Sequence, residues 1–257
     1  MARHISPRNA ISRREMLGAA IAAGSGMLSG CEAMGLEWRY RYRLVGEIQH
    51  NGKVFRASSV IEVIHRKGFM GYPGDARGEA VAIDIPGVGT LFLALYSRTL
   101  DHDWVYLMPR KAFLPLLPSW IMSDEEVLNR LRNLRDARVE LKPDEYPMIV
   151  RFRNNADPST VEQVRPDNSL KSDVDQGDIV VKALPGDAPK SPDLTDIGAH
   201  LRGMWIETTD DPVTRTIRNR LPWLKALWPG SCLDGSPTIR TNGALSNRLE
   251  TLAFERG

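Results

Sequence analysis

The chain has 257 residues, of which 42% are apolar, 26% charged and 7% aromatic, and these proportions are typical of a globular protein and exclude disorder throughout. The formal charge is +2, but the first 30 residues hold four arginines against one glutamate. Removing this surplus of three positive charges leaves a net charge of −1 for residues 31–257. Such a charge excludes a general polyanion binder, because these proteins need many Lys and Arg contacts to phosphate. We therefore expect no nucleic-acid partner.

Residues 1–30 have the order of a signal peptide: a basic segment, an apolar segment and then small residues. The apolar segment, Met16 to Ser29, has about 14 residues, whereas a membrane-spanning helix needs about 20. Its end overlaps the sequence "LSGC", Leu28 to Cys31, which resembles a bacterial lipobox and implies cleavage before Cys31 and acylation of its sulfur. A buried N-terminal helix with an incidental cysteine is the weaker interpretation, because it does not explain the order of the three segments.

The segment "SRREML", Ser12 to Leu17, resembles the twin-arginine export motif through Arg13 and Arg14. It departs from the usual pattern at Met16, where Phe is typical, and at Gly18, where Lys is common. Paired arginines also occur in ordinary secretory signals, so the general secretory route stays open.

An acylated Cys31 would hold the protein at a bacterial membrane, facing the periplasm, since two or more acyl chains anchor a protein stably. Glu32 rather than Asp follows it, so the aspartate signal for inner-membrane retention of enteric bacteria is absent and the outer membrane is favoured. The periplasm is oxidising, but Cys232 alone remains in the body of the chain and cannot form an internal disulfide. We expect Cys232 to be an unpaired thiol rather than a nucleophile.

The first predicted element is a β-hairpin over residues 37–66, because Asn51-Gly52 is a strong signal for a two-residue turn. That turn places Glu47 opposite Arg56 and Arg41 opposite Glu62, as charge pairs on one face. The other face is apolar and predicts a buried side. Its residues are Trp38, Tyr40, Tyr42, Leu44, Ile48, Phe55, Ala57, Ile61 and Val63.

Two arginines of the stretch "WRYRYR" have no acidic partner in this hairpin, because Arg39 and Arg43 face Ile64 and Val60. They follow the expected lipid anchor within a dozen residues. Contact with anionic lipid headgroups is therefore the functional interpretation of these two side chains.

The remaining pattern predicts one α+β domain over residues 31–228, built mainly from antiparallel sheet with a few short helices. A second hairpin is expected in Gly78–Ser97. Further strands are expected at Trp104–Met108, Ala137–Leu141, Pro147–Phe152, Ile179–Leu184 and Leu201–Thr208.

Three helix starts carry capping signals. Ser123 begins a capping box with Glu126, while Asp211-Pro212 and the shorter Asp157-Pro158 each place proline directly after a capping aspartate. A polar, proline-rich surface loop is expected over residues 184–198, and residues 229–257 are expected to form a loosely ordered tail.

No motif with a known mechanism is present in the sequence: there is no phosphate loop, dinucleotide fingerprint, HExxH, CxxC or GxSxG. "DHD", Asp101 to Asp103, offers carboxylate and imidazole ligands, but in an extended segment at most the two aspartates converge. A solvated loop is the favoured interpretation of these residues. Asp210 and Asp211 suggest paired carboxylates, although a helix cap already explains Asp211. We therefore predict no cofactor, metal or catalytic residue.

Five segments of the sequence carry a family resemblance: "RYRL…SSVIEV", "RGEAVAID", "KPDEYPMIVRF", "ADPSTVEQV" and "TTDDPVTRTIRNRLPWL". Together they resemble a family of uncharacterised exported or hypothetical proteins of alphaproteobacteria. The resemblance covers roughly residues 40–224 and implies no activity, since the family has none assigned. The sequence therefore favours a membrane-anchored envelope lipoprotein with a non-enzymatic binding or structural role. The alternative is an envelope hydrolase or metal-dependent enzyme that uses groups near His102 or Asp210.

Overall fold

A computed structural model describes residues 37–69, 71–117, 123–166, 192–240 and 243–257, and residues 38–257 form one compact unit. Arg13, Arg14 and Cys31, with the rest of the expected signal peptide, lie outside the described residues, as does the expected strand Ile179–Leu184. No helix in the described ranges is long and apolar enough to cross a membrane.

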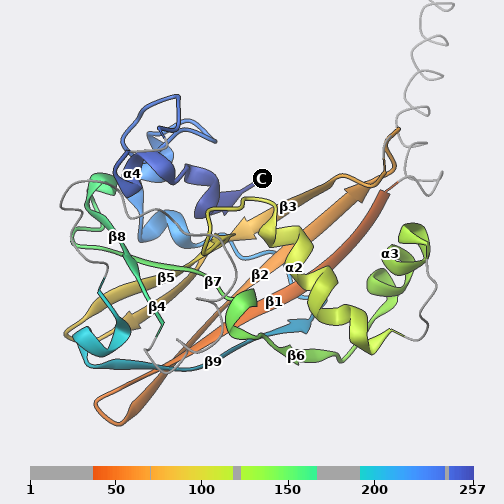
Figure 1. Ribbon diagram of the computed structural model, residues 1–257, viewed down its shortest axis with the longest axis horizontal. Coiled ribbons are helices and arrows are strands. Elements are labelled where there is room, and N and C mark those ends of the chain that lie inside the picture. The colour runs from red at the N-terminus through yellow and green to blue at the C-terminus, as the bar shows by residue number, and fades with distance from the viewer. Residues whose placement is uncertain (1–36, 70, 118–122, 167–191, 241–242) are drawn as a thin grey trace, which may run out of the picture. The chain divides into compact units, whose positions relative to one another are not determined.

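The described strands form two antiparallel sheets (Figure 1), and with a few short helices they confirm the predicted α+β class. The six-stranded sheet has the order β10-β3-β2-β1-β9-β6. Its strands are β1 (Glu37–His50), β2 (Lys53–Arg66), β3 (Gly74–Glu79), β6 (Arg138–Glu140), β9 (Ala199–Thr208) and β10 (Glu255–Arg256). The four-stranded sheet, β4-β5-β7-β8, consists of β4 (Val81–Ile85), β5 (Gly89–Ser97), β7 (Pro147–Phe152) and β8 (Val161–Val164).

The hairpin of β1 and β2 has the predicted turn, with φ of 47° at Asn51 and 73° at Gly52. Positive φ at both positions is what a type I′ turn requires, and Asn and Gly tolerate it best. The predicted register is confirmed by the ion pair between Arg41 and Glu62, whose atoms are 2.9 Å apart.

The first core packs the inner face of this hairpin against the four-stranded sheet. Tyr42, Leu44 and Ile48 of β1 are fully buried together with Leu93 of β5. The two strands approach so closely at Gly46 that an added Cβ would lie 2.6 Å from the Leu93 side chain. The middle of the predicted buried face of the hairpin therefore packs against the four-stranded sheet.

A second core covers the opposite face of the four-stranded sheet. Alternate residues of β5, such as Phe92 and Tyr96, point into it, while their neighbours belong to the first core. Its other side consists of C-terminal residues that include Leu233, Leu249 and Phe254. The expectation of a loosely ordered tail over residues 229–257 is therefore wrong, because the sheet needs these apolar residues to cover its second face.

The α-helices of the described residues are α2 (Trp104–Phe113), α3 (Asp124–Asn133) and α4 (Leu245–Arg248). Single turns of 3₁₀ helix are η2 (Leu114–Leu116), η3 (Pro143–Glu145), η4 (Pro158–Thr160), η6 (Leu194–Ile197), η7 (Ile217–Asn219), η8 (Pro222–Lys225) and η9 (Thr251–Ala253). Two predicted caps are confirmed: the Ser123 hydroxyl accepts the Glu126 N–H at 3.3 Å, and the Asp157 carboxylate accepts the Ser159 N–H at 2.9 Å.

The strand predicted at Trp104–Met108 is wrong, since these residues begin α2. The helix contains Pro109, which has no N–H to donate to the carbonyl of Val105, four residues earlier. The buried hydroxyl of Tyr42 donates to that carbonyl instead, at 2.8 Å. The Tyr42 hydroxyl of β1 thus supplies the hydrogen bond that the Val105 carbonyl lacks because of Pro109. No local sequence pattern reveals this contact.

The helix predicted after Asp211-Pro212 is also wrong. Residues 213–216 are not helical, and the chain forms only the turns η7 and η8. The Asp211 carboxylate pairs with Arg43 of β1 rather than capping a helix, so a tertiary contact replaces the predicted local one.

Candidate functional site

The start of β1 lies beside the connection between β2 and β3, at one end of the six-stranded sheet (Figure 1). The rings of Trp38 and Tyr72 meet edge to face with centroids 5.3 Å apart. The Nδ1–H of His65, near the end of β2, donates to the carbonyl of Tyr72 at 3.2 Å. These contacts bring the first described residues of the chain together with the residues that follow β2.

One carboxylate near this end is surrounded by three arginines. The side chain of Glu62 is only 9% exposed, and its oxygens lie 2.9 Å from Arg41, 3.7 Å from Arg39 and 3.9 Å from Arg77. One negative charge cannot balance three guanidinium groups. Glu62 and the three arginines together carry a net charge of +2, whereas residues 31–257 as a whole carry −1.

A groove of about 470 Å³ opens next to this cluster, between β1, the end of β9 and the end of α3. Four arginines and two acids contribute to its lining, so its net charge is +2. The charged residues are Arg39, Arg41, Arg132, Arg135, Glu62 and Asp210. We call this hollow the arginine groove, and its chemistry suits a phosphate or carboxylate group, to which guanidinium binds through two N–H donors.

The prediction that Arg39 and Arg43 have no acidic partner in the hairpin is wrong for Arg39. Arg39 lies 3.7 Å from Glu62, while Arg43 pairs with Glu207 of β9 at 3.2 Å and also with Asp211. The two acids that pair with Arg43 come from β9 and the segment after it, on the side of β1 that β2 does not occupy. Arg43 is consequently a structural link between strands.

The suggested carboxylate pair, Asp210 and Asp211, is divided between two arginines. Asp210 lies 3.7 Å from Arg135 in the arginine groove, and Asp211 pairs with Arg43. Each of these two carboxylates therefore has its own cationic partner.

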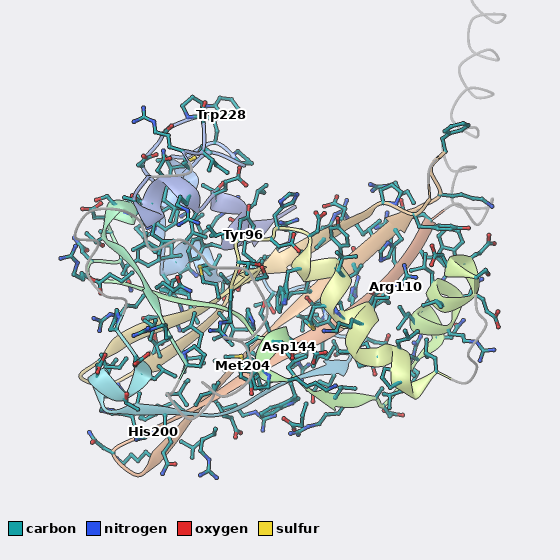
Figure 2. All side chains as sticks on the ribbon, viewed as in Figure 1. Tyr96, Arg110, Asp144, His200, Met204 and Trp228 are labelled. Atoms are coloured by element: carbon teal, nitrogen blue, oxygen red, sulfur yellow. The ribbon has the colours of Figure 1, made fainter. Side chains whose placement is uncertain are left out.

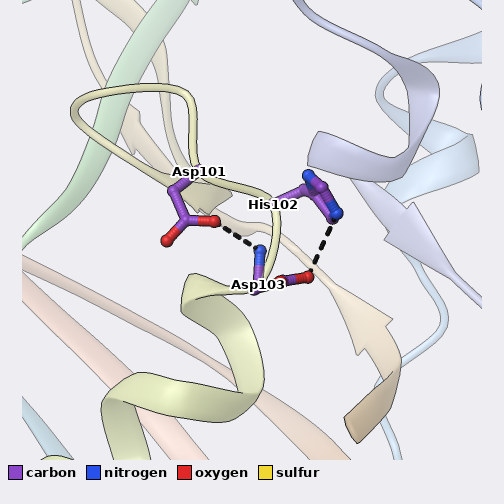
Figure 3. Close-up of side chains that lie close together, drawn as sticks. All are labelled: Asp101, His102 and Asp103. Atoms are coloured by element: carbon purple, nitrogen blue, oxygen red, sulfur yellow. Dashed lines mark hydrogen bonds and ion pairs between the residues drawn. The ribbon is translucent and has the colours of Figure 1, made fainter. Parts of the chain in front are cut away.

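Asp101, His102 and Asp103 converge, contrary to the expectation that at most the aspartates would meet (Figure 3). One potential ligand atom from each residue lies within 4.8 Å of the other two. The segment is a turn before α2, not an extended strand, so the Asp103 N–H reaches the Asp101 carboxylate at 2.9 Å and His102 Nε2 lies 3.1 Å from Asp103. Two carboxylates and an imidazole are donors that zinc accepts.

A hollow of about 520 Å³ borders His102 and is closed on the other side by the C-terminal residues Arg248 and Glu250. The hydroxyl of Tyr96, labelled in Figure 2, donates to the Glu250 carboxylate in its wall. Burial raises the pKa of Tyr96 above its usual value, and the bond to Glu250 raises it further. Sequence analysis did not identify Tyr96, Arg248 or Glu250, because the tail that carries two of them was expected to be loosely ordered.

The other residues considered individually from the sequence are His50, His200 and Cys232. His50 lies beside the hairpin turn, with Nδ1 2.9 Å from the carbonyl of Gly198, and His200 is exposed on β9. Cys232 is 1% exposed. Burial raises the pKa of its thiol, which keeps it in the neutral form that is a poor nucleophile.

No protein-family model, no curated protein and no solved structure matches this chain. The resemblance to exported alphaproteobacterial proteins therefore stays a prediction, and the two hollows have to be interpreted from their own chemistry.

Proposed function

We propose that this protein is an envelope lipoprotein, held at a bacterial membrane by lipid on Cys31, with a binding or structural role there rather than an enzymatic one. The observation that carries the proposal is the sequence order of basic segment, apolar segment and "LSGC" ending at Cys31. Its compartment would be the periplasm, with the outer membrane favoured, and Arg13 and Arg14 would direct export by the twin-arginine route.

The charge distribution supports a role close to the membrane surface. Trp38 follows Cys31 by seven residues, and a chain of that length spans at most about 25 Å. The arginine groove begins at the next residue, Arg39. A lipid anchor on Cys31 would thus keep this positively charged part of the protein close to lipid phosphates, whose attraction for Lys and Arg decays within a Debye length.

Intact-mass measurement on protein isolated from bacterial membranes tests the anchor. We expect a chain that begins at Cys31 and carries the added mass of its acyl groups. Cys31→Ser should abolish both the cleavage and the acyl mass, while the matched variant Cys232→Ser should process normally. A wild-type protein that retains Met1, or that begins at Cys31 without lipid, would remove the basis of the proposal.

The export route is tested separately by replacing Arg13 and Arg14 together with lysine. Twin-arginine export should then stop and unprocessed precursor should accumulate in the cytoplasm. A double variant that is still cleaved and acylated normally would assign the protein to the general secretory route instead.

One observation favours the alternative, a metal-dependent hydrolase of the envelope: the convergence of Asp101, His102 and Asp103 next to a hollow that also contains Arg248. A metal ion there would supply a Lewis acid and an activated water. Metal analysis of the purified protein decides between the two functions. A stoichiometric ion that is lost in His102→Ala but retained in the control His50→Ala would favour the enzyme.

A further inference from the structure

The hollow beside His102 lies between the turn that precedes α2 and the C-terminal segments, which the imidazole faces (Figure 3). Its volume of about 520 Å³ falls within the roughly 300–1,000 Å³ that small-molecule sites occupy. Its apolar lining consists of Leu100, Ile239 and Leu252, and its polar groups include those of Tyr96, Arg248 and Glu250. We call it the C-terminal hollow.

One wall is a turn with a well-defined backbone. The Ser97 hydroxyl accepts the N–H groups of Thr99 at 3.2 Å and Asp101 at 2.9 Å. The N–H of Leu100 donates to the carbonyl of Ser97 at 3.0 Å. Leu100 has a φ of 67°, a left-handed conformation that a bulky side chain seldom adopts. The hydrogen bonds around Ser97 hold it in this conformation, and the turn therefore presents Leu100 to the hollow in a fixed position.

The opposite wall is held by a buried amide. Asn247 of α4 is 4% exposed, and its side-chain oxygen accepts the N–H of Arg240 at 2.7 Å. This bond ties the loop that carries Ile239 to the helix that carries Arg248. The apolar side chain and the guanidinium group thus keep their places on the same wall.

Arg256 of β10 connects the two walls. Its side chain is almost fully buried and donates to the carbonyl of His102 at 2.7 Å and to that of Leu252 at 3.3 Å. These bonds give Arg256 a structural role. They also fix the distance across the hollow, so that the site is formed before any ligand arrives.

Arg248 differs from Arg256 because, within the described ranges, no carboxylate or carbonyl is paired with its guanidinium group. Its side chain is nevertheless part-buried. Glu250 lines the same hollow, but it accepts the hydroxyl of Tyr96. Removing a cation from water without a partner costs free energy. The N–H donors of Arg248 are therefore available to an anionic ligand.

The surroundings of Arg248 favour one class of anion. A guanidinium group binds a carboxylate or a phosphate through two parallel N–H donors. The negative charge of Glu250 in the same hollow repels a dianionic phosphate more strongly than a singly charged carboxylate. The apolar side chains opposite favour a ligand whose remaining part is apolar, because such a ligand removes their surface from water.

We propose that the C-terminal hollow binds a small monocarboxylate with an apolar body, whose carboxylate pairs with Arg248 and whose body packs against Leu100 and Ile239. The inference rests on the binding role proposed above, to which it assigns a class of ligand. It depends neither on the lipid anchor nor on a metal ion.

Three matched probes test the ligand class by saturation-transfer NMR on the full processed protein in lipid nanodiscs, with empty nanodiscs as the blank. Phenylacetate should receive saturation and bind with a dissociation constant of about 1 mM or below, a value within reach of a ligand of this size. Phenylacetamide has the same shape without the charge and should bind about tenfold more weakly. Benzylphosphonate, which carries a second negative charge, should also bind more weakly than phenylacetate.

Variants locate the site. Arg248→Gln should weaken phenylacetate binding about tenfold and leave the melting temperature unchanged, since this side chain has no intramolecular partner to lose. Arg202→Gln, at an exposed position on β9, removes the same charge and should leave binding unchanged. Ile239→Ser should weaken binding about threefold or more, and the fold should tolerate it because Ile239 is 49% exposed.

Several results would overturn the inference. They are an absence of saturation transfer, equal binding of phenylacetamide, tighter binding of benzylphosphonate, and an Arg248→Gln variant that binds like the wild type. Loss of phenylacetate binding on adding EDTA would assign the carboxylate to a metal ion near His102 and would contradict the role of Arg248. The mass of each sample reports the anchor separately. An unacylated chain that binds phenylacetate would refute only the anchor, and an acylated chain that does not bind it would refute only this inference.

Discussion

The carboxylate of Glu62 on β2 lies 2.9 Å from the guanidinium group of Arg41 on β1. The same carboxylate is approached by Arg39 at 3.7 Å and by Arg77 of β3 at 3.9 Å. One acid thus holds three neighbouring strands together through their arginines. The segment "WRYRYR" is consequently part of a strand with a charged face and a buried face. On the charged face, Arg39 and Arg41 pair with Glu62, while Arg43 pairs with acids of β9 and the segment after it.

Glu62→Gln should lower the free energy of unfolding by about 1–2 kcal/mol. A hydrogen bond to a charged group contributes roughly 1.5–3 kcal/mol, and screening of the partly exposed arginines reduces that contribution. The variant also leaves three like charges next to one another. Urea denaturation measures the loss, which should shrink as salt is added because the interaction is electrostatic.

Glu47→Gln is the matched control for this prediction. Glu47 faces Arg56 across the same two strands, but their atoms are 3.9 Å apart and the arginine side chain is 53% exposed. An exposed pair of this kind contributes about 0–1 kcal/mol. If both variants lose the same free energy, the central role given to Glu62 is wrong.

A second buried carboxylate connects β3 to the C-terminal half of the chain. Glu79 is 3% exposed, and it accepts the backbone N–H groups of Thr216 at 2.6 Å and Ile217 at 2.8 Å together with the Thr216 hydroxyl at 2.8 Å. Glu79→Gln should destabilise the protein by about 1.5–3 kcal/mol, because an amide group replaces an acceptor oxygen that buried donors require. Thermal unfolding followed by circular dichroism would measure the change.

Glu255→Gln on the adjacent strand β10 is the comparison for Glu79. Its carboxylate pairs with Arg218 at 2.7 Å, but the arginine is 53% exposed, so we expect a loss below about 1 kcal/mol. Equal melting temperatures for Glu79→Gln and wild type would show that water replaces the lost acceptor and that the connection is not essential.

The structure also predicts a loss of stability in acid through His65. Burial lowers the pKa of His65 below its usual value, and the positive charge of Arg110 lowers it further, against opposing effects of Tyr72 and Asp124. The unfolded chain therefore binds a proton more readily than the folded one. The contribution of His65 to the free energy of unfolding is fully present above the unfolded pKa of about 6.5. It is lost as the pH falls below that value.

Melting temperatures of wild type and His65→Gln, compared between neutral pH and about pH 5, isolate this contribution. The glutamine does not titrate, so the variant should lose less stability over that range than the wild type. His50→Gln serves as the control for replacing a histidine by glutamine, because His50 is part-exposed at the hairpin turn. Parallel curves for wild type and His65→Gln would refute the assignment.

The elements predicted correctly are those whose signals are local. Asn51-Gly52 determines a turn and hence a register, and Ser123 with Glu126 determines a helix start, because the groups that interact are a few residues apart. The helix at Trp104–Phe113 was not predictable in this way. Its missing hydrogen bond is compensated by Tyr42, from a strand some 60 residues earlier in the chain.

The candidate sites, too, depend on contacts between distant parts of the chain that local sequence patterns do not contain. The partners of Arg43 lie on β9 and after it, so its environment depends on a strand pairing that a hairpin pattern does not contain. The convergence around His102 required a turn where an extended segment was assumed.

The last prediction concerns the C-terminal segment, whose burial the composition did not indicate. Phe254 is fully buried, and its ring meets Phe92 at 6.1 Å, Phe152 at 5.5 Å and Trp223 at 5.7 Å between centroids. Phe254→Ala should destabilise the protein by about 3–5 kcal/mol, the loss that accompanies removal of a large buried aromatic side chain and the cavity it leaves.

Trp228→Ala is the control for Phe254→Ala, because Trp228 is a large aromatic residue of the same C-terminal region that is 83% exposed. Its replacement should change the free energy of unfolding by less than about 0.5 kcal/mol. Deletion of residues 229–257 should go further and yield a chain that unfolds at low urea concentration, since it uncovers one face of the four-stranded sheet. A truncated protein as stable as the full chain would mean that the second core contributes little, and that the sheet is stabilised by the first core alone.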